Sequence, residues 1–278
     1  MPPYRLLAVD IDGTLVNSRD ELTLATRAAL RRAVDADIRV VLVTGRRYSR
    51  ALPLVAPLAL DVPLITANGA LIKDPVDHRT LFRAEFPPGV LASVLRLVAM
   101  AGYEPVLYAD TYAKGYDYYC RRVEIEQPEL AEFFRVNPDF HRLRPTLVED
   151  PPPGVFSCFT MGTRADMMTL AAELQRQHPR QLYVHVIRSP RYAGHMCEIA
   201  PLGVTKWSGI EHLARDWDIA DDEVCAVGDD VNDIPMISAA GLGVAMGNAP
   251  QEVKAAADRI APCHDSDGLA QVVEWLLA

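Results

Sequence analysis

The first 70 residues alternate short apolar runs with helical segments, and this alternation limits the folds open to the chain. The apolar runs are YRLLAV before Asp10, IRVVLV at 38–43 and VPLIT at 62–66. A helix from about Thr23 to Ala36, with the threonine as its cap, is predicted between the first two runs. Continuous apolar strands separated by helices indicate a parallel sheet covered on both faces.

The middle of the chain follows a different pattern. After the second strand, Pro53 and Pro57 predict a broken helix, and a hairpin with its turn near Asp74–Asp77 comes next. Strands and helices then cease to alternate one to one, and residues 111–153 resist assignment, so an α+β insert over an antiparallel sheet is predicted. The alternation returns from about Pro201. We therefore predict one α/β domain made from both ends of the chain, with an insert in its middle. The predicted bounds are 1–84 plus 197–278 for the core domain and 85–196 for the insert.

The composition narrows the class of protein and its partners. Half of the 278 residues are hydrophobic, which supports an ordinary core, and the net charge of −9 disfavours a nucleic-acid partner. No apolar stretch has the length needed to span a bilayer, and no signal peptide is evident, so no membrane partner is expected. The five cysteines include no CxxC pair, which favours a reducing, cytoplasmic location over a disulfide framework.

Polar motifs follow four of the predicted strands: DIDGT at 10–14, TGR at 44–46, TANGA at 66–70 and GDDVND at 228–233. Ligands bind beyond the carboxyl ends of strands in parallel α/β sheets. Carboxylates that converge there repel one another unless a cation lies between them, and oxygen ligands suit Mg²⁺. A single DxDG is equally well explained as a turn with a capping aspartate. Four polar strand ends together favour a phosphoryl site.

DIDGTL, TGR, PLGVTK and GDDVND resemble the four motifs of the haloacid dehalogenase superfamily of phosphohydrolases, in order and spacing along the whole chain. The large insert between the second and third motifs resembles the C2 type of cap. The chain as a whole is similar to the Cof-type, subclass IIB sugar-phosphate phosphatases. This resemblance implies a Rossmann-like, doubly wound parallel core with an inserted α+β C2 cap domain.

The resemblance also implies a role for each motif residue. Asp10 would be the nucleophile that forms an aspartyl-phosphate, and Asp12 would be the general acid and then the general base. Gly13 would let the chain turn so that both side chains face one cavity. Asp12 would bind the metal through its main-chain carbonyl, and Asp233 would support either the metal or Lys206. The implied phosphate-binding groups are Ile11, Thr44, Gly45, Lys206 and Asn232, and the implied Mg²⁺ ligands are Asp10, Asp12, Asp229 and Asp233.

Several residues have a functional and a structural interpretation side by side. Arg46 is either a substrate contact or a surface arginine, and Asn68 either faces the substrate or only forms a turn before Gly69. Asp230 is predicted to cap a helix or to be solvated, and Cys225 to be a buried hydrophobe. The candidates for substrate selection in the insert, each of which could instead serve packing, are Tyr112, Lys114, Tyr116, Tyr118, Arg121, Arg188, Arg191 and His195.

Two remaining features are predicted to be structural. His185, His195 and Cys197 lack the spacing of a standard zinc site, so we expect them to serve the fold. Asp37 stands after the first helix, where the similar family commonly has glycine. A left-handed helix cap is less comfortable for aspartate than for glycine.

The leading hypothesis is a Mg²⁺-dependent phosphomonoester hydrolase that acts on a small phosphorylated metabolite, such as a sugar phosphate. The insert would close over the site and select the leaving group. A phosphomutase on the same fold is the alternative enzyme. A non-catalytic phosphate-ester-binding regulatory module is the alternative from another class, and the complete set of motif residues argues against it. The chain is expected to be a monomer or a homodimer.

Overall fold

The computed structural model describes residues 4–188 and 193–278 and divides into two compact units. The core unit comprises Met1–Phe82 with Thr205–Ala278, and the insert unit comprises Arg83–Val204. The predicted end of the insert, between residues 196 and 197, falls inside strand β11 (His195–Pro201). Because β11 pairs with β9 and β10 of the insert unit, the insert continues to Val204.

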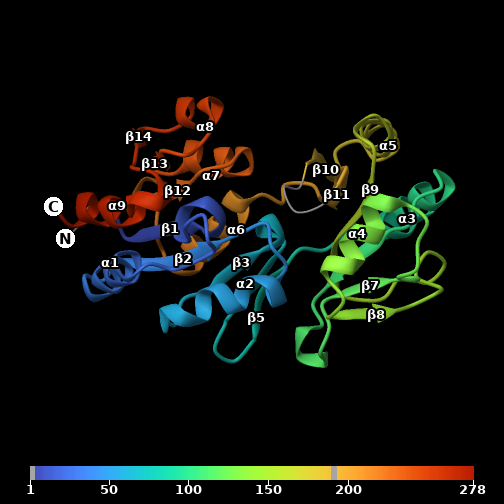
Figure 1. Ribbon diagram of the computed structural model, residues 1–278, viewed down its shortest axis with the longest axis horizontal. Coiled ribbons are helices and arrows are strands. Elements are labelled where there is room, and N and C mark those ends of the chain that lie inside the picture. The colour runs from blue at the N-terminus through green and yellow to red at the C-terminus, as the bar shows by residue number, and fades with distance from the viewer. Residues whose placement is uncertain (1–3, 189–192) are drawn as a thin grey trace. The chain divides into compact units, whose positions relative to one another are not determined.

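Within the described residues, the core unit contains an eight-stranded sheet in the order β14-β13-β12-β1-β2-β3-β4-β5. Strands from β14 to β3 are parallel neighbours, and β4 runs antiparallel to β3. Strands from the two ends of the chain, blue and orange in Figure 1, lie side by side at the centre. The strands are β1 (Leu6–Asp10), β2 (Arg39–Val43), β3 (Leu64–Thr66), β4 (Leu71–Lys73), β5 (Thr80–Arg83), β12 (Val224–Gly228), β13 (Leu242–Ala245) and β14 (Arg259–Ile260).

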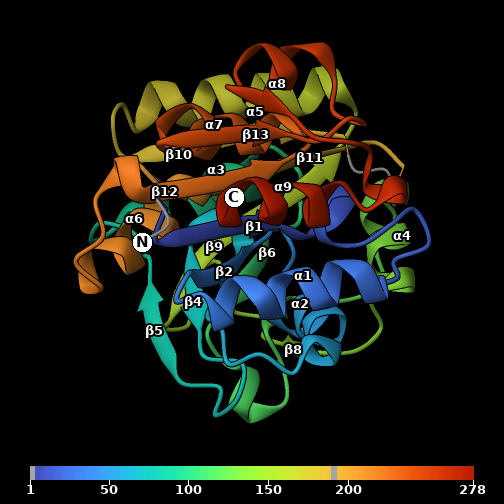
Figure 2. The same cartoon turned by 90° about the vertical axis from the view of Figure 1, so that its left-hand side faces the viewer.

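Helices cover both faces of this sheet. Leu6 and Ala8 of β1 belong to one apolar cluster with Ile210 and Met236, which lie on two of the helices. Helices α1 and α9 pack against each other elsewhere in the unit (Figure 2). The core unit is therefore doubly wound, as predicted. Its helices are α1 (Leu24–Asp35), α2 (Tyr48–Val55), α6 (Lys206–Asp216), α7 (Ile234–Ala239), α8 (Gln251–Ala255) and α9 (Gly268–Leu277).

Two local predictions in this unit had different outcomes. The side chain of Thr23 caps α1 by accepting a hydrogen bond from the N–H of Thr26 at 3.1 Å, which confirms the predicted cap. Of the two predicted breaks, the one at Pro53 is wrong, because α2 continues through Pro53 to Val55, whereas the one at Pro57 agrees with the end of α2 and the short 3-10 turn at Ala56–Leu58. Proline removes its own N–H donor and crowds the carbonyl four residues earlier, and α2 accommodates both effects in its last turn without ending at Pro53.

The insert unit is built on a second sheet, with the order β10-β11-β9-β6-β7-β8 among the described residues. Its pairs are antiparallel except β7 with β8, which is parallel and departs from the prediction. The stretch 111–153, which the sequence left unassigned, contains β7, α4 and β8. The strands are β6 (Val106–Ala109), β7 (Tyr118–Cys120), β8 (His141–Leu143), β9 (Val155–Gly162), β10 (Leu182–Ile187) and β11. The helices are α3 (Val90–Met100), α4 (Pro128–Val136) and α5 (Arg164–Gln177).

Every helix in the described parts of the chain is too short or too polar to cross a lipid bilayer.

Candidate active site

The register of the core sheet brings the polar strand ends to one edge. Asp10 at the end of β1 lies opposite Val43 of β2, and Val9 lies opposite Val227 of β12. The motif residues that follow these strands therefore start at nearly the same level. This is the edge at which parallel α/β sheets bind ligands.

A buried lysine joins two carboxylates at this edge. The Nζ atom of Lys206 lies 2.6 Å from Asp10 Oδ1 and 2.6 Å from Asp233 Oδ1. The Lys206 side chain is 2% exposed and the Asp233 side chain is fully buried. Lys206 is the first residue of α6, and the hydroxyl of Thr205 caps that helix by accepting the Ser208 N–H. Burial alone would lower the pKa of Lys206, but Asp10 and Asp233 raise it above its ordinary value, so this lysine is charged.

Negative charge exceeds positive charge around this lysine. Burial, followed by repulsion from Asp233, raises the pKa of Asp10 well above its ordinary value despite the attraction of Lys206. The same two causes raise the pKa of Asp229 to about 7. Carboxylate oxygens of Asp10, Asp229 and Asp233 lie within 4.8 Å of one another. The cluster therefore has the donor chemistry and the excess negative charge that a hard divalent cation would offset.

Gly13 brings the first motif close to the fourth. Its φ of +75° lies in the left-handed region, and a Cβ there would lie 2.2 Å from Asp229 Oδ2. Glycine is therefore required both by the backbone and by the space that Asp229 occupies. Thr14, the next residue, donates its hydroxyl to Asp229 Oδ1 at 3.4 Å.

Arg46 pairs with the second aspartate of the first motif. Its Nε atom donates to Asp12 Oδ2 at 2.8 Å, its Nη2 atom donates to Asp12 Oδ1, and Nη2 also contacts Asp20 Oδ1 at 3.2 Å. The Arg46 side chain is only 13% exposed, whereas that of Asp12 is 46% exposed. Arg46 is therefore not the surface arginine of the structural alternative. Its guanidinium fixes the direction of a carboxylate that remains open to solvent.

The second and third strand ends contribute hydroxyl and amide groups. Thr44 is fully buried, and its hydroxyl accepts the Arg46 N–H at 3.0 Å, which leaves the hydroxyl hydrogen for another acceptor. Asn232 Nδ2 donates to Asn68 Oδ1 at 3.1 Å, and a Cβ on Gly45 would approach the same Asn68 oxygen within 3.0 Å. Asn232 Oδ1 is buried and has no hydrogen-bond partner among the described residues. Ile11, the remaining residue assigned to phosphate binding, is buried at the start of the turn after β1.

The fourth motif folds around Asp233. Its Oδ2 atom accepts the main-chain N–H groups of Asp229 and Asp230, each at 3.0 Å. The side chain of Asp230 accepts the N–H of Val231, which confirms the predicted capping role. Because three donors already occupy the two oxygens of Asp233, the geometry favours support of Lys206 over direct metal binding for this residue.

Sequence reasoning missed Asn248. This residue follows β13 and donates to Asp229 Oδ2 at 3.0 Å and to the Gly13 carbonyl at 2.9 Å. The available signal was a fifth polar strand end, MGNA after the apolar run GLGVA.

Two candidates for substrate selection in the insert unit have structural partners. Tyr118 is fully buried and donates its hydroxyl to the Asn137 carbonyl at 2.7 Å. Arg121 pairs with Glu104 through two hydrogen bonds of 2.7 Å. For both residues the packing interpretation is therefore the better one.

The other described candidates in the insert unit are more exposed to solvent than Tyr118. Tyr116 shares a hydrogen bond with the Tyr119 hydroxyl at 2.9 Å, and Tyr112 stacks on Phe140. The remaining described candidates range from partly buried to exposed, and one candidate, Arg191, lies outside the described residues. These accessible candidates are Lys114, Arg188 and His195.

His185, His195 and Cys197, which lack the spacing of a zinc site, do not all point to one face of the insert sheet. In the antiparallel pair β10–β11, His185 lies opposite Glu198, and Cys197 lies opposite Val186. Adjacent positions of a strand point to opposite faces of the sheet, so His185 and Cys197 point apart. Cys225 is fully buried, and burial raises its pKa above the ordinary thiol value, in agreement with its predicted structural role.

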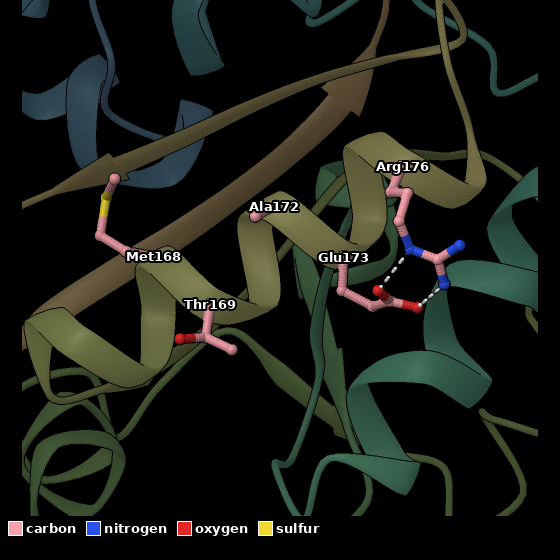
Figure 3. A pocket seen from close by; sticks show the side chains of 5 residues that line it. All are labelled: Met168, Thr169, Ala172, Glu173 and Arg176. Carbon is pink, nitrogen blue, oxygen red and sulfur yellow. Dashed lines mark hydrogen bonds and ion pairs between the residues drawn. The ribbon is translucent and has the colours of Figure 1, made fainter.

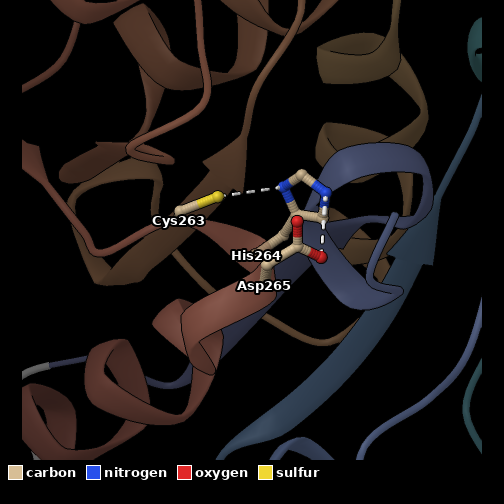
Figure 4. A group of neighbouring side chains, drawn as sticks. All are labelled: Cys263, His264 and Asp265. Atoms are coloured by element: carbon tan, nitrogen blue, oxygen red, sulfur yellow. Dashed lines mark hydrogen bonds and ion pairs between the residues drawn. The ribbon is translucent and has the colours of Figure 1, made fainter. Parts of the chain in front are cut away.

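Two other groupings contain none of the motif residues. A hollow along α5 is lined by apolar and charged side chains, among them the ion pair of Glu173 with Arg176 (Figure 3). Cys263, His264 and Asp265 are consecutive, but Cys263 approaches Nδ1 of the imidazole and Asp265 approaches Nε2 (Figure 4). One ligand atom from each of these three side chains lies within 4.8 Å of the others, but none of the three is a motif residue.

The geometry agrees with comparisons to known proteins. The family model described as haloacid dehalogenase-like hydrolase matches residues 7–273. The chain belongs to this family, as its motifs predicted. It is 28% identical to phosphatase YwpJ of Bacillus subtilis, over 98% of this chain and 100% of that protein. It is 30% identical to pyridoxal phosphate phosphatase YbhA of Escherichia coli, over 97% of both chains. A haloacid dehalogenase-like hydrolase from Bacteroides thetaiotaomicron has the same fold, with a TM-score of 0.79 and 27% identity, over 98% of this chain and 99% of that one.

Proposed function

We propose that this protein is a Mg²⁺-dependent phosphatase that hydrolyses phosphomonoesters of small metabolites through an aspartyl-phosphate. The observation that carries the proposal is the buried Asp10 carboxylate, held at 2.6 Å by Lys206 within a cluster of excess negative charge. Such a cluster is costly to fold and is typical of a catalytic site. Relatives that match nearly the whole chain and are named phosphatases support the same conclusion.

The proposed reaction has two transfers. In the first, an oxygen of Asp10 attacks phosphorus, the bond to the ester oxygen breaks, and Asp12 gives that oxygen its proton. In the second, Asp12 takes a proton from water as the water oxygen attacks phosphorus. This step releases phosphate and restores the Asp10 carboxylate. Lys206 holds Asp10 in position and offsets charge on the phosphoryl group, while Arg46 orients Asp12.

The phosphoryl oxygens would meet donors from three loops. We assign to this role the main-chain N–H groups of Ile11 and Gly45, the hydroxyl of Thr44 and the amide of Asn232. Thr44 is buried and accepts the Arg46 N–H, so its hydroxyl hydrogen can be donated to a phosphoryl oxygen, and Asn232 Nδ2 keeps a second hydrogen besides the one that it donates to Asn68 Oδ1. Both features fit a site that a polar ligand completes.

Asp10, Asp229 and the main-chain carbonyl of Asp12 are the residues that would hold Mg²⁺. Bound there, Mg²⁺ would neutralise carboxylate charge and polarise the phosphoryl oxygens. Both oxygens of Asp229 receive uncharged donors, from Thr14 and Asn248, so its negative charge is left for a cation to offset.

A phosphorylated sugar or a compound of similar size is the substrate class that we propose. The relative YbhA is named for pyridoxal phosphate, which is a small phosphomonoester. Of the residues predicted to select the substrate, Arg46 and Asn68 lie among the motif residues, where they contact Asp12 and Asn232. Tyr116, Arg188 and His195 of the insert unit remain predictions. We expect a cytoplasmic protein, and its state as a monomer or homodimer also remains a prediction.

Hydrolysis of p-nitrophenyl phosphate tests the proposal. Activity in Mg²⁺ should vanish with excess EDTA and return with added Mg²⁺, and Asp10→Asn should lower kcat by about 10⁴-fold or more. Asp61→Asn, the same substitution on an exposed loop, should retain full activity. Activity of Asp10→Asn near that of the Asp61 variant would rule out the aspartyl-phosphate.

The two alternatives give different results with phosphorylated metabolites. A phosphomutase would release little phosphate, would need a bisphosphate activator and would form an isomeric ester. A binding module would show calorimetric binding of phosphate esters without turnover. Release of one phosphate per alcohol formed would exclude both.

A further inference from the structure

Asn248 connects three separate segments at the motif edge of the core sheet. Its Nδ2 atom donates to the Gly13 carbonyl at 2.9 Å and to Asp229 Oδ2 at 3.0 Å. Its Oδ1 atom accepts the main-chain N–H of His264 at 3.1 Å. One amide thus links the turn after β1, the loop after β12 and the segment that precedes α9.

These partners fix the orientation of the amide. Gly13 and Asp229 offer only acceptors at these atoms, and the main-chain N–H of His264 is a donor. A flipped amide would direct its oxygen at a carbonyl and a carboxylate, and both hydrogen bonds of Nδ2 would be lost. The amide therefore holds the Asp229 carboxylate at a set position relative to the turn that contains Asp12.

The loop that carries Asn248 is itself held closely. Met246 donates its N–H to the Gly228 carbonyl at 2.9 Å, and Gly247 donates to the Pro262 carbonyl at 3.3 Å. A Cβ on Gly247 would lie 2.8 Å from the main-chain nitrogen of Cys263. The backbone that precedes Asn248 is thus held against two neighbouring segments, and this fixes where the Asn248 side chain starts.

We propose that Asn248 is a positioning residue for the metal site, which orients Asp229 and the first-motif turn before Mg²⁺ arrives. This inference rests on the proposed function, in which Asp229 and the Asp12 carbonyl are ligands. Among the described residues, the other side-chain donor to the Asp229 carboxylate is the Thr14 hydroxyl, which is 3.4 Å away and therefore forms a weak hydrogen bond. Asn248 thus provides the shorter restraint on this carboxylate. Groups that orient metal ligands typically change metal affinity by ten- to a hundredfold.

Calorimetric titration of the substrate-free protein with Mg²⁺ alone tests the inference. Asn248→Ala should raise the Kd for Mg²⁺ about tenfold. Asn17→Ala is the matched control, because Asn17 is also partly buried in the core unit and also makes three side-chain hydrogen bonds, none of them to a motif residue. This control should bind Mg²⁺ as the natural protein does. The melting temperature in EDTA should be lower in both variants than in the natural protein. Because only Asn248→Ala should also bind Mg²⁺ more weakly, the comparison separates loss of stability from loss of metal affinity.

Each outcome has a distinct meaning. If the natural protein hydrolyses the ester but binds no Mg²⁺, the metal-dependent function proposed above fails. If it binds Mg²⁺ and Asn248→Ala binds equally well, only the positioning role fails. Should Asn248→Ala not fold, Asn248→Ser takes its place, because a hydroxyl is too short to reach Gly13 and Asp229 together. If neither variant folds in Mg²⁺, the amide serves the fold as a whole and the inference is overturned.

Discussion

The core unit and the insert unit bury charge in opposite ways. In the core unit, one lysine faces Asp10 and Asp233 with Asp229 nearby, and the pKa values of Asp10 and Asp229 are raised. In the insert unit, Glu104 lies between Arg121 and Arg122. Burial alone would raise the pKa of Glu104, but these arginines lower it. A buried carboxylate that is paired with cations stabilises the fold. Buried carboxylates in excess of the nearby cations are instead typical of a site that binds a charged ligand.

The largest effect is expected from Lys206→Met. Loss of the lysine leaves buried Asp10 and Asp233 without their cation, which should cost about 3–5 kcal/mol in the free energy of unfolding. Hydrolysis should fall by at least about 10²-fold, because the phosphoryl charge loses a donor. Urea unfolding in EDTA and kcat measure the two effects. A loss below about 1 kcal/mol would mean that the lysine does not balance this cluster.

Glu104→Gln tests the balanced charge of the insert unit. The variant removes the anion that two arginines share, and a cost of about 2 kcal/mol is expected at pH 7. The pKa of Glu104 is lower in the folded protein, so its contribution is complete above the unfolded value of about 4.3 and declines as pH falls. The difference between the natural protein and the variant should therefore narrow below about pH 4. A difference that is constant with pH would contradict an ionic origin.

Tyr118→Phe distinguishes packing from substrate contact in the insert unit. The substitution leaves the Asn137 carbonyl without the Tyr118 donor and should cost about 1 kcal/mol of stability. Because Tyr118 is fully buried, kcat/KM should stay unchanged. Tyr116→Phe is the companion variant for comparison of kcat/KM, because the Tyr116 side chain is partly exposed and the Tyr118 side chain is not. A tenfold fall in kcat/KM for Tyr118→Phe at unchanged stability would reassign this residue to the substrate.

The smallest expected effect is a gain of stability from Asp37→Gly. Asp37 follows α1 with φ at +63°, in the left-handed region that the sequence analysis anticipated. Glycine removes the strain of a left-handed backbone conformation but increases the conformational entropy of the unfolded chain. A net gain of about 0.5 kcal/mol in the free energy of unfolding is therefore expected. Thermal unfolding measures it, and activity should be unaffected because Asp37 is not a motif residue. Destabilisation by this change would show that the aspartate makes a compensating interaction.

Much of the core unit was predictable from sequence alone. Apolar runs of strand length between helices determined the parallel sheet, and motifs at strand ends predicted which side chains would share an edge. Capping by Thr23 is equally local, because donor and acceptor are three residues apart. The family followed from four motifs in order, and the match over residues 7–273 confirms it.

Tertiary structure decided what depends on contacts between distant residues. Asn248 meets Gly13 across 235 positions of sequence, and no local pattern shows which partner a polar residue after a strand will find. Tyr118 and Arg121 likewise had two interpretations until their partners Asn137 and Glu104 were seen. Periodicity and propensity report a residue's own neighbourhood, whereas hydrogen bonds and charge balance depend on which segments fold together. The sequence by itself thus determined the sheet and its reactive edge, and only the folded chain decided which polar groups orient that edge and which hold the insert unit together.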